Sequence, residues 1–68
     1  MSVPDISFVI PALDEEAAIG RVVSEARAAA ARLGASCDLL VLDGASRDGT
    51  VRAAEAAGAR VVVETAGF

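Results

Sequence analysis

Acidic side chains gather after each of three short apolar segments in this chain. They are residues 14–16 after the first segment, Asp43 after the second and Glu64 after the third. A carboxylate at such a position can accept hydrogen bonds from the imide of a nucleobase or from the hydroxyl groups of a ribose. Asp43 is well placed for that role, and Glu15 could take part in the same pocket.

Each of these acidic residues also has an ordinary structural interpretation. Asp at a strand end is a common turn former and helix cap. Asp14 precedes two acidic residues at the start of a helical pattern, so it is predicted to be an N-cap. Asp48 is predicted to cap a second helix, with Ser46 as the other candidate. For Asp43 and Glu15, position alone leaves both ligand binding and turn formation open.

The composition restricts the chemistry available within this chain. There is no His and only one cysteine, Cys37, which excludes Ser-His and Cys-His nucleophile pairs, a disulfide and a Cys/His zinc site. The formal net charge is −4, and the six basic residues are all Arg and form no basic patch. A general nucleic-acid binder is therefore disfavoured. The remaining groups are carboxylates, hydroxyls, backbone amides and a metal ion.

The chain carries no targeting signal that its sequence reveals. No apolar run approaches the ~18 residues that span a bilayer. The N-terminus lacks the basic region and the apolar stretch of a signal peptide. We therefore expect a cytoplasmic protein, with any membrane association arising only from further segments of a longer protein.

Strand and helix patterns alternate along the chain. Residues 6–10 are rich in β-branched and aromatic residues and stop at Pro11, which cannot continue a central strand. Residues 15–33 have helical spacing of apolar side chains and end before Gly34, a typical C′ glycine. The apolar face of this helix consists of Ile19, Val22, Val23, Ala26, Ala30 and Leu33.

The second half continues with strand, helix and strand. Residues 38–43 contain a continuous apolar run, which is typical of a parallel strand covered on both faces. A short helix from about Val51 closes at Gly58, and residues 60–64 form the third strand. The order predicts an α/β fold, a βαβαβ unit with right-handed crossovers and a parallel sheet ordered 3-2-1. Such a unit is half of a three-layer, Rossmann-like domain.

Two consequences follow from this topology. Ligands of open parallel sheets bind beyond the carboxyl ends of the strands, where the acidic groups lie. The first strand has nothing to pair with its free side, so its edge (Ile6, Phe8 and Ile10) could pair with another chain. The Rossmann and P-loop phosphate fingerprints are absent, and the acidic start of the first helix would repel a pyrophosphate.

Two motifs carry a resemblance to a known family. The stretch Val9–Glu16, followed by Ile19, resembles the opening V-I-P-A-x-N-E-E-x-x-I of family 2 glycosyltransferases, which have the GT-A fold. The stretch Val41–Thr50 is similar to their V-V-D-D-G-S-x-D-G-T. The resemblance covers roughly residues 3 to 64.

Three positions depart from the family pattern. Asp14 replaces the usual Asn, Gly44 replaces the second Asp and Ala45 replaces the Gly. Some relatives also lack an acid at the Gly44 position. The Gly44–Ala45 order could move the turn by one residue.

The resemblance implies that residues 1–68 are a single partial domain, the N-terminal, donor-nucleotide-binding part of a nucleotide-sugar-dependent glycosyltransferase. Such an enzyme transfers a hexosyl group from a nucleoside-diphosphate sugar. Its nucleotide-binding residues here would be Pro11, Ala12, Glu15, Asp43 and Ser46. The divalent cation (Mg or Mn) would be held by ligands beyond this chain, as would the acceptor-side base. We therefore predict weak or no nucleotide binding and no sugar transfer by these residues alone.

Two alternatives to the enzyme segment follow from the same residues. An inert α/β module would self-associate through its exposed first strand. A receiver-like phosphoacceptor module would use Asp43, but it needs a downstream Lys, and the chain has none.

Overall fold

The computed structural model describes residues 3–65. Its elements in chain order are β1 (Ile6–Ala12), α1 (Glu16–Arg32), β2 (Cys37–Asp43), α2 (Thr50–Ala56) and β3 (Arg60–Val63). The three strands lie in the order β1-β2-β3, and both neighbouring pairs are parallel. The predicted α/β fold and the predicted strand order are confirmed. Among the described residues, no helix has the length and apolar character needed to cross a membrane.

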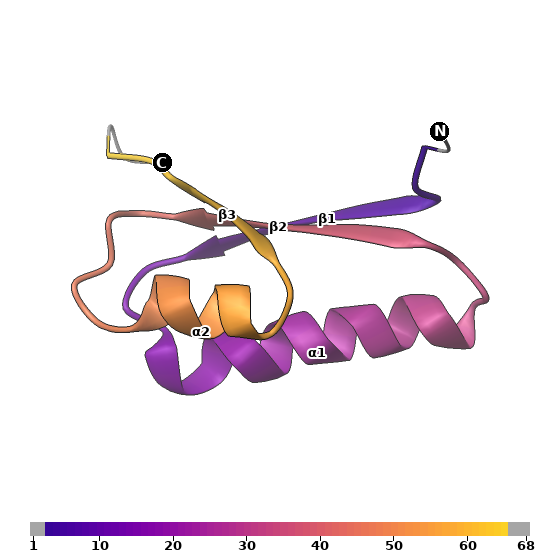
Figure 1. Cartoon of the computed structure of the whole chain (residues 1–68), viewed down its shortest axis with the longest axis horizontal. Coiled ribbons are helices and arrows are strands. Elements are labelled where there is room, and N and C mark those ends of the chain that lie inside the picture. The colour runs from indigo at the N-terminus through magenta and orange to yellow at the C-terminus, as the bar shows by residue number, and fades with distance from the viewer. Residues whose placement is uncertain (1–2, 66–68) are drawn as a thin grey trace.

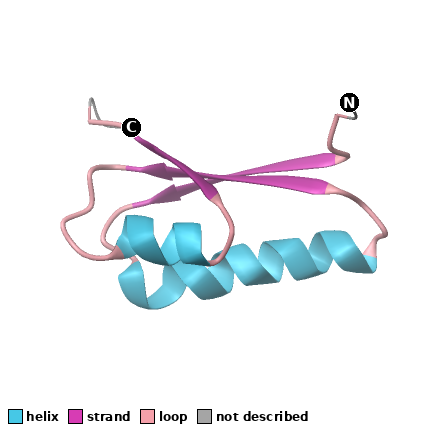
Figure 2. Ribbon diagram, in the orientation of Figure 1, coloured by secondary structure: helices cyan, strands magenta, loops and turns pink. Residues whose placement is uncertain are grey.

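Both helices lie on the same face of the sheet (Figures 1 and 2). The two crossovers run in the same direction along the sheet, so right-handed connections put both helices on one side. The described residues therefore contain two layers, one of strands and one of helices. The expectation that β2 is covered on both faces is wrong for this part of the chain. Its residues alternate instead, with Leu39 and Val41 buried and Leu40 and Leu42 half-buried.

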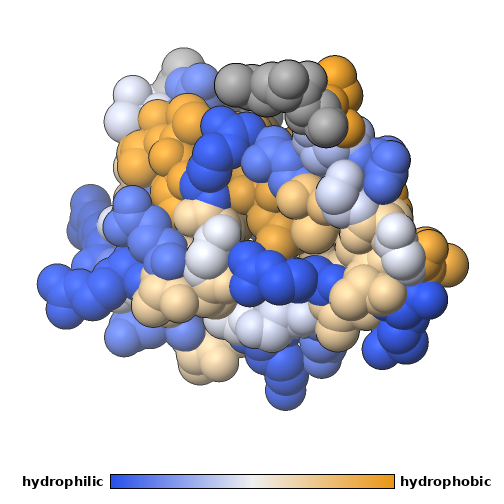
Figure 3. Space-filling model, turned by 45° about the vertical axis from the view of Figure 1, so that its right-hand side comes forward, coloured by the Kyte–Doolittle hydropathy of each residue, from blue (hydrophilic) through white to orange (hydrophobic). Residues whose placement is uncertain are grey.

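The uncovered face of the sheet is largely apolar. Val9 and Val62 on this face are 58% and 48% exposed. Figure 3 shows apolar surface mostly in its upper half, where the sheet lies. At one end of the face, the Arg60 guanidinium donates two hydrogen bonds to Asp38, at 3.0 and 2.7 Å. This pair lowers the pKa of Asp38 and raises that of Arg60.

Strand β1 continues past Pro11, which the sequence pattern placed at its end. Its neighbour Ala12 accepts a hydrogen bond from Gly44 N–H at 2.9 Å, and Ile6 N–H donates to Ser36 at 3.1 Å. These even-numbered residues turn their backbone groups toward β2, so Pro11 turns its nitrogen toward the outer edge. The strand loses no ladder bond there, which explains why this edge strand tolerates the proline.

The core lies between the sheet and the helices. Val23 of α1 and Val41 of β2 are completely buried at its centre. Of the predicted α1 face, Val22 and Leu33 lie at its margins and are exposed. The side chains of Ile6, Phe8 and Ile10 in β1 point toward the helices. Phe8 and Ile10 pack partly buried against the core, and Ile6 is half-buried. The outer edge of β1 is therefore formed by backbone, and self-association through it stays a prediction.

Two glycines end the helices in left-handed backbone. Gly34 after α1 has φ +66°, as predicted for a C′ glycine, and Gly58 after α2 has φ +97°. Next to Gly58, Arg27 of α1 donates a hydrogen bond to the Ala57 carbonyl at 2.7 Å. The guanidinium group thus ties α1 to the carboxyl end of α2.

Substitution of two glycines by alanine should have opposite effects on stability. A Cβ at Gly20, inside α1, would meet no atom within 4 Å, so Gly20→Ala should stabilise the protein by about 1 kcal/mol through helix propensity. A Cβ at Gly58 would lie 2.5 Å from Arg27 Nη2 in left-handed backbone, so Gly58→Ala should destabilise it. Urea unfolding of the two variants and the wild type measures both. Equal effects of the two substitutions would contradict this account of α1 and α2.

Candidate functional site

The two loops that leave the carboxyl ends of β1 and β2 are joined by hydrogen bonds between them. The first loop comprises residues 13–15 and the second residues 44–49. Each supplies acceptors for backbone N–H groups of the other or of the helix that follows it. The junction lies at the edge where parallel α/β sheets bind ligands.

Asp43 and Ser46 form the inner part of this junction. The Asp43 side chain is completely buried, with 0% exposure. Its Oδ2 accepts a hydrogen bond from the Ser46 N–H at 2.7 Å, and its Oδ1 accepts one from the Ser46 hydroxyl at 2.5 Å. The same hydroxyl oxygen accepts a hydrogen bond from the Asp14 N–H at 2.8 Å. A buried carboxylate thus connects through Ser46 to the first loop.

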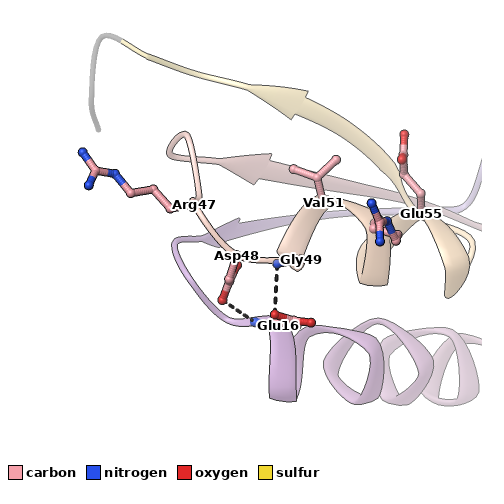
Figure 4. Close-up of a pocket in the computed structure, with 7 residues that line it drawn as sticks. Glu16, Arg47, Asp48, Gly49, Val51 and Glu55 are labelled. Carbon is pink, nitrogen blue, oxygen red and sulfur yellow. Dashed lines mark hydrogen bonds between the residues drawn. The ribbon is translucent and has the colours of Figure 1, made fainter.

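Thr50 and Asp48 connect the starts of the two helices. The buried Thr50 hydroxyl accepts a hydrogen bond from the Glu15 N–H at 2.8 Å and donates one to Asp48. Asp48 accepts from the Glu16 N–H at 3.3 Å and from the Thr50 N–H at 3.0 Å. In return, the Glu16 carboxylate accepts from the Gly49 N–H at 3.0 Å (Figure 4). Each helix therefore receives acceptors for its first N–H groups from the other.

The prediction that Asp14 caps α1 is wrong. The N-cap position is Glu15, which makes no side-chain cap bond. Asp14 has left-handed backbone, with φ +50°, and its carboxylate accepts a hydrogen bond from the Arg47 N–H at 2.8 Å. The N–H groups at the start of α1 are satisfied instead by Thr50, which accepts from Glu15, and by Asp48, which accepts from Glu16. The N-cap position of α2 is Gly49 and not the predicted Asp48, although Asp48, one residue earlier, accepts a hydrogen bond from the Thr50 N–H at the start of the helix.

The structure brings the five predicted site residues to one edge of the sheet. Pro11 and Glu15 are exposed, and Ala12 is buried. Ala12 pairs with Asp43 in the register of β1 and β2, and its carbonyl holds Gly44. Ser46 reaches the first loop directly. Their role as nucleotide ligands stays a prediction.

A shallow hollow of about 600 Å³ lies beside the second loop, and the five predicted residues are not among those that line it. It is lined by Glu16, Arg47, Asp48, Gly49, Val51, Arg52 and Glu55 (Figure 4). None of these residues was predicted to bind a ligand, and Asp48 was predicted to be a helix cap. Two of its carboxylates, Glu16 and Asp48, already accept hydrogen bonds from backbone N–H groups.

Comparisons with known proteins point to one class of enzyme. Neither a protein-family model nor a protein of curated function matches the chain. Solved structures of glycosyltransferases do contain a segment similar to this fold.

These structures are named for glucosyl-3-phosphoglycerate synthase from Mycobacterium tuberculosis. One, in complex with Mn²⁺, UDP and glucosyl-3-phosphoglycerate, is 41% identical, with a TM-score of 0.70 over 88% of this chain. Another, in complex with Mn²⁺, UDP-glucose and phosphoglyceric acid, is 44% identical, with a TM-score of 0.68 over 88%. A mycobacterial protein is 45% identical, with a TM-score of 0.70 over 88%. The chain spans only about a fifth of these neighbours, 21%, 21% and 19% of their lengths.

Acid should weaken the junction through Asp48. Hydrogen bonding, first of all from the Thr50 hydroxyl, holds the pKa of Asp48 below its ordinary value of 3.8. A lowered pKa in the folded state adds stability above about pH 4, and that stability is lost as the pH falls through the folded-state pKa. Asp48→Asn should therefore be less stable than the wild type at neutral pH. Urea unfolding from pH 7 downward should show this difference shrinking below about pH 4; a constant difference would contradict it.

The left-handed residue of the second loop is Ala45, with φ +66°, at the position where the resembled motif has glycine. Ala45→Gly should stabilise the protein by about 0.5 kcal/mol, because relief of left-handed strain exceeds the added chain entropy. Ala56→Gly, at the exposed last position of α2, is the matched control and should destabilise the protein slightly, because glycine has the lower helix propensity. Thermal unfolding of both variants tests the sign of each change.

Proposed function

We propose that this chain is the donor-nucleotide-binding segment of a nucleotide-sugar-dependent glycosyltransferase of family 2, with the GT-A fold. The observation that carries the proposal is the similarity to glucosyl-3-phosphoglycerate synthase structures, at 41–44% identity over 88% of this chain. Two of those structures hold UDP or UDP-glucose. The complete enzyme would transfer a hexosyl group from a nucleoside-diphosphate sugar.

The donor nucleoside would bind at the edge formed by the two loops. Pro11, Ala12 and Glu15 belong to the first side of this pocket, and Asp43 and Ser46 to the second. The exposed Glu15 carboxylate, which accepts no hydrogen bond from the described residues, is available to the ribose hydroxyls or the base. The register that pairs Ala12 with Asp43 supports the placement of both sides at one edge.

A divalent cation would neutralise the diphosphate charge in the complete enzyme. One neighbour structure was determined with Mn²⁺ and UDP. Among residues 3–65, no group of three or more His, Cys, Asp or Glu side chains is placed to hold a metal ion. The carboxylates at the junction fit poorly as ligands, since Asp43 and Asp48 accept backbone and hydroxyl hydrogen bonds. The Mg or Mn ligands would therefore come from outside this chain.

Titration with UDP, followed by amide NMR spectra, tests the proposal. We expect weak binding, with a dissociation constant on the order of 1 mM, and shifts confined to residues 11–15 and 43–46. Glu15→Gln should weaken binding severalfold, because a charged acceptor is lost. Glu25→Gln, on the exposed side of α1 with Arg21 as partner, is the matched control and should bind as the wild type does.

A radiolabelled donor assay completes the test. Incubation of the chain with UDP-glucose and 3-phosphoglycerate should give no transfer, since no group of side chains among residues 3–65 is placed to hold the cation that would stabilise the leaving nucleotide. Turnover by the chain would contradict the proposal that the groups needed for transfer lie outside it. Dimerisation in size-exclusion chromatography without any UDP shifts would replace the proposal with the self-associating module.

A further inference from the structure

We propose that Asp43 and Ser46 act as positioning residues, which hold the first loop in the shape that the nucleoside meets, and are not themselves nucleoside ligands. This inference rests on the proposed function. It separates the residues of the predicted pocket that contact the nucleoside from those that hold the loop in place.

The hydrogen-bonding capacity of Asp43 is directed inward. Its side chain is completely buried, and each carboxylate oxygen already accepts a hydrogen bond from Ser46. Because the side chain is completely buried, a base or ribose could reach this carboxylate only if the loop that carries Ser46 moved away from it. A buried acceptor that loses its partner is costly, so contact with the ligand would be gained at the expense of the loop.

Ser46 is similarly occupied. A hydroxyl group has a single proton to donate, and that of Ser46 goes to Asp43. Its oxygen also accepts the hydrogen bond from the Asp14 N–H. Donation to a ligand would release the buried carboxylate of Asp43, so the structure assigns the hydroxyl to the connection between the two loops.

The loop that Ser46 holds is in an unusual conformation. Asp14 has φ +50°, in the left-handed region that residues with a side chain adopt uncommonly, Asn and Asp more often than the others. The Asp14 N–H donates a hydrogen bond to the Ser46 hydroxyl, and the Asp14 carboxylate accepts one from the Arg47 N–H. These bonds fix the backbone between the exposed residues Pro11 and Glu15, which are left as the ligand-facing side chains.

Base selectivity separates a positioning role from direct contact with the base, and the Ser46 variants below test the positioning role itself. A carboxylate that accepts the imide N–H of uracil would favour UDP over CDP, and Asp43→Asn would change that ratio. A positioning carboxylate acts through the loop, so Asp43→Asn should weaken the binding of UDP and the binding of CDP by the same factor. NMR titrations with both nucleotides measure the ratio.

Ser46→Ala and Ser46→Thr supply the matched pair. Ser46→Ala should speed hydrogen exchange of the Asp14 amide in the nucleotide-free protein. It should also weaken the binding of UDP and of CDP equally, by severalfold. Ser46→Thr keeps the hydroxyl group and should restore both the slow exchange and the affinity. Far-UV circular dichroism of each variant identifies any that fail to fold.

The outcomes distinguish this inference from the proposed function. A wild-type chain that binds neither nucleotide overturns the proposed function, and the positioning role with it. A wild-type chain that binds while Ser46→Ala binds equally well overturns the positioning role alone. A changed UDP-to-CDP ratio in Asp43→Asn does the same, because it makes Asp43 a direct reader of the base.

Discussion

The shape of this fold at the candidate functional edge depends on hydrogen bonds between its two loops and the helices that follow them, and the bonded residues lie more than thirty positions apart in the chain. The first N–H groups of α1 find their acceptors in Thr50 and Asp48, and Gly49 at the start of α2 donates to Glu16. Helix starts expose N–H groups that need acceptors. Because each helix supplies acceptors for the other, both must begin at the same place, and the carboxyl ends of β1 and β2 are brought to one rim.

The order of the elements could be predicted from the sequence because its signals are local. Apolar spacing in residues 15–33, the left-handed glycine at 34 and the apolar run of β2 each act within a few residues. The predictions that were wrong, on the end of β1 and on the covering of β2, concern features that depend on the arrangement of the whole fold. Pro11 is tolerated because β1 is an edge strand whose odd-numbered residues face outward, and β2 is covered on one face because both crossovers run the same way. Neither fact is visible in a short window of sequence.

In the candidate site, too, the position of the residues could be predicted from the sequence, but their contacts could not. Parallel topology was sufficient to predict that Glu15 and Asp43 lie at one rim. It could not show which carboxylate faces solvent, because that depends on which partners each finds in three dimensions. Asp43 finds Ser46 three residues onward and is enclosed, whereas Glu15 stays exposed while its backbone N–H is bound by Thr50. The cap of α1 was missed for a related reason, since its acceptors come from a distant segment.

The proline in β1 also governs how a further strand could be recruited to this molecule. Along the outer edge of β1, Ser7 and Val9 offer backbone N–H donors to an incoming strand. The next residue along the strand that faces this edge is Pro11, which offers a carbonyl but no N–H. A recruited strand would thus find a continuous ladder only along the first half of β1. Next to the rim formed by the two loops, this pairing would be interrupted, so another polypeptide could not extend the sheet along that end of β1 without a gap.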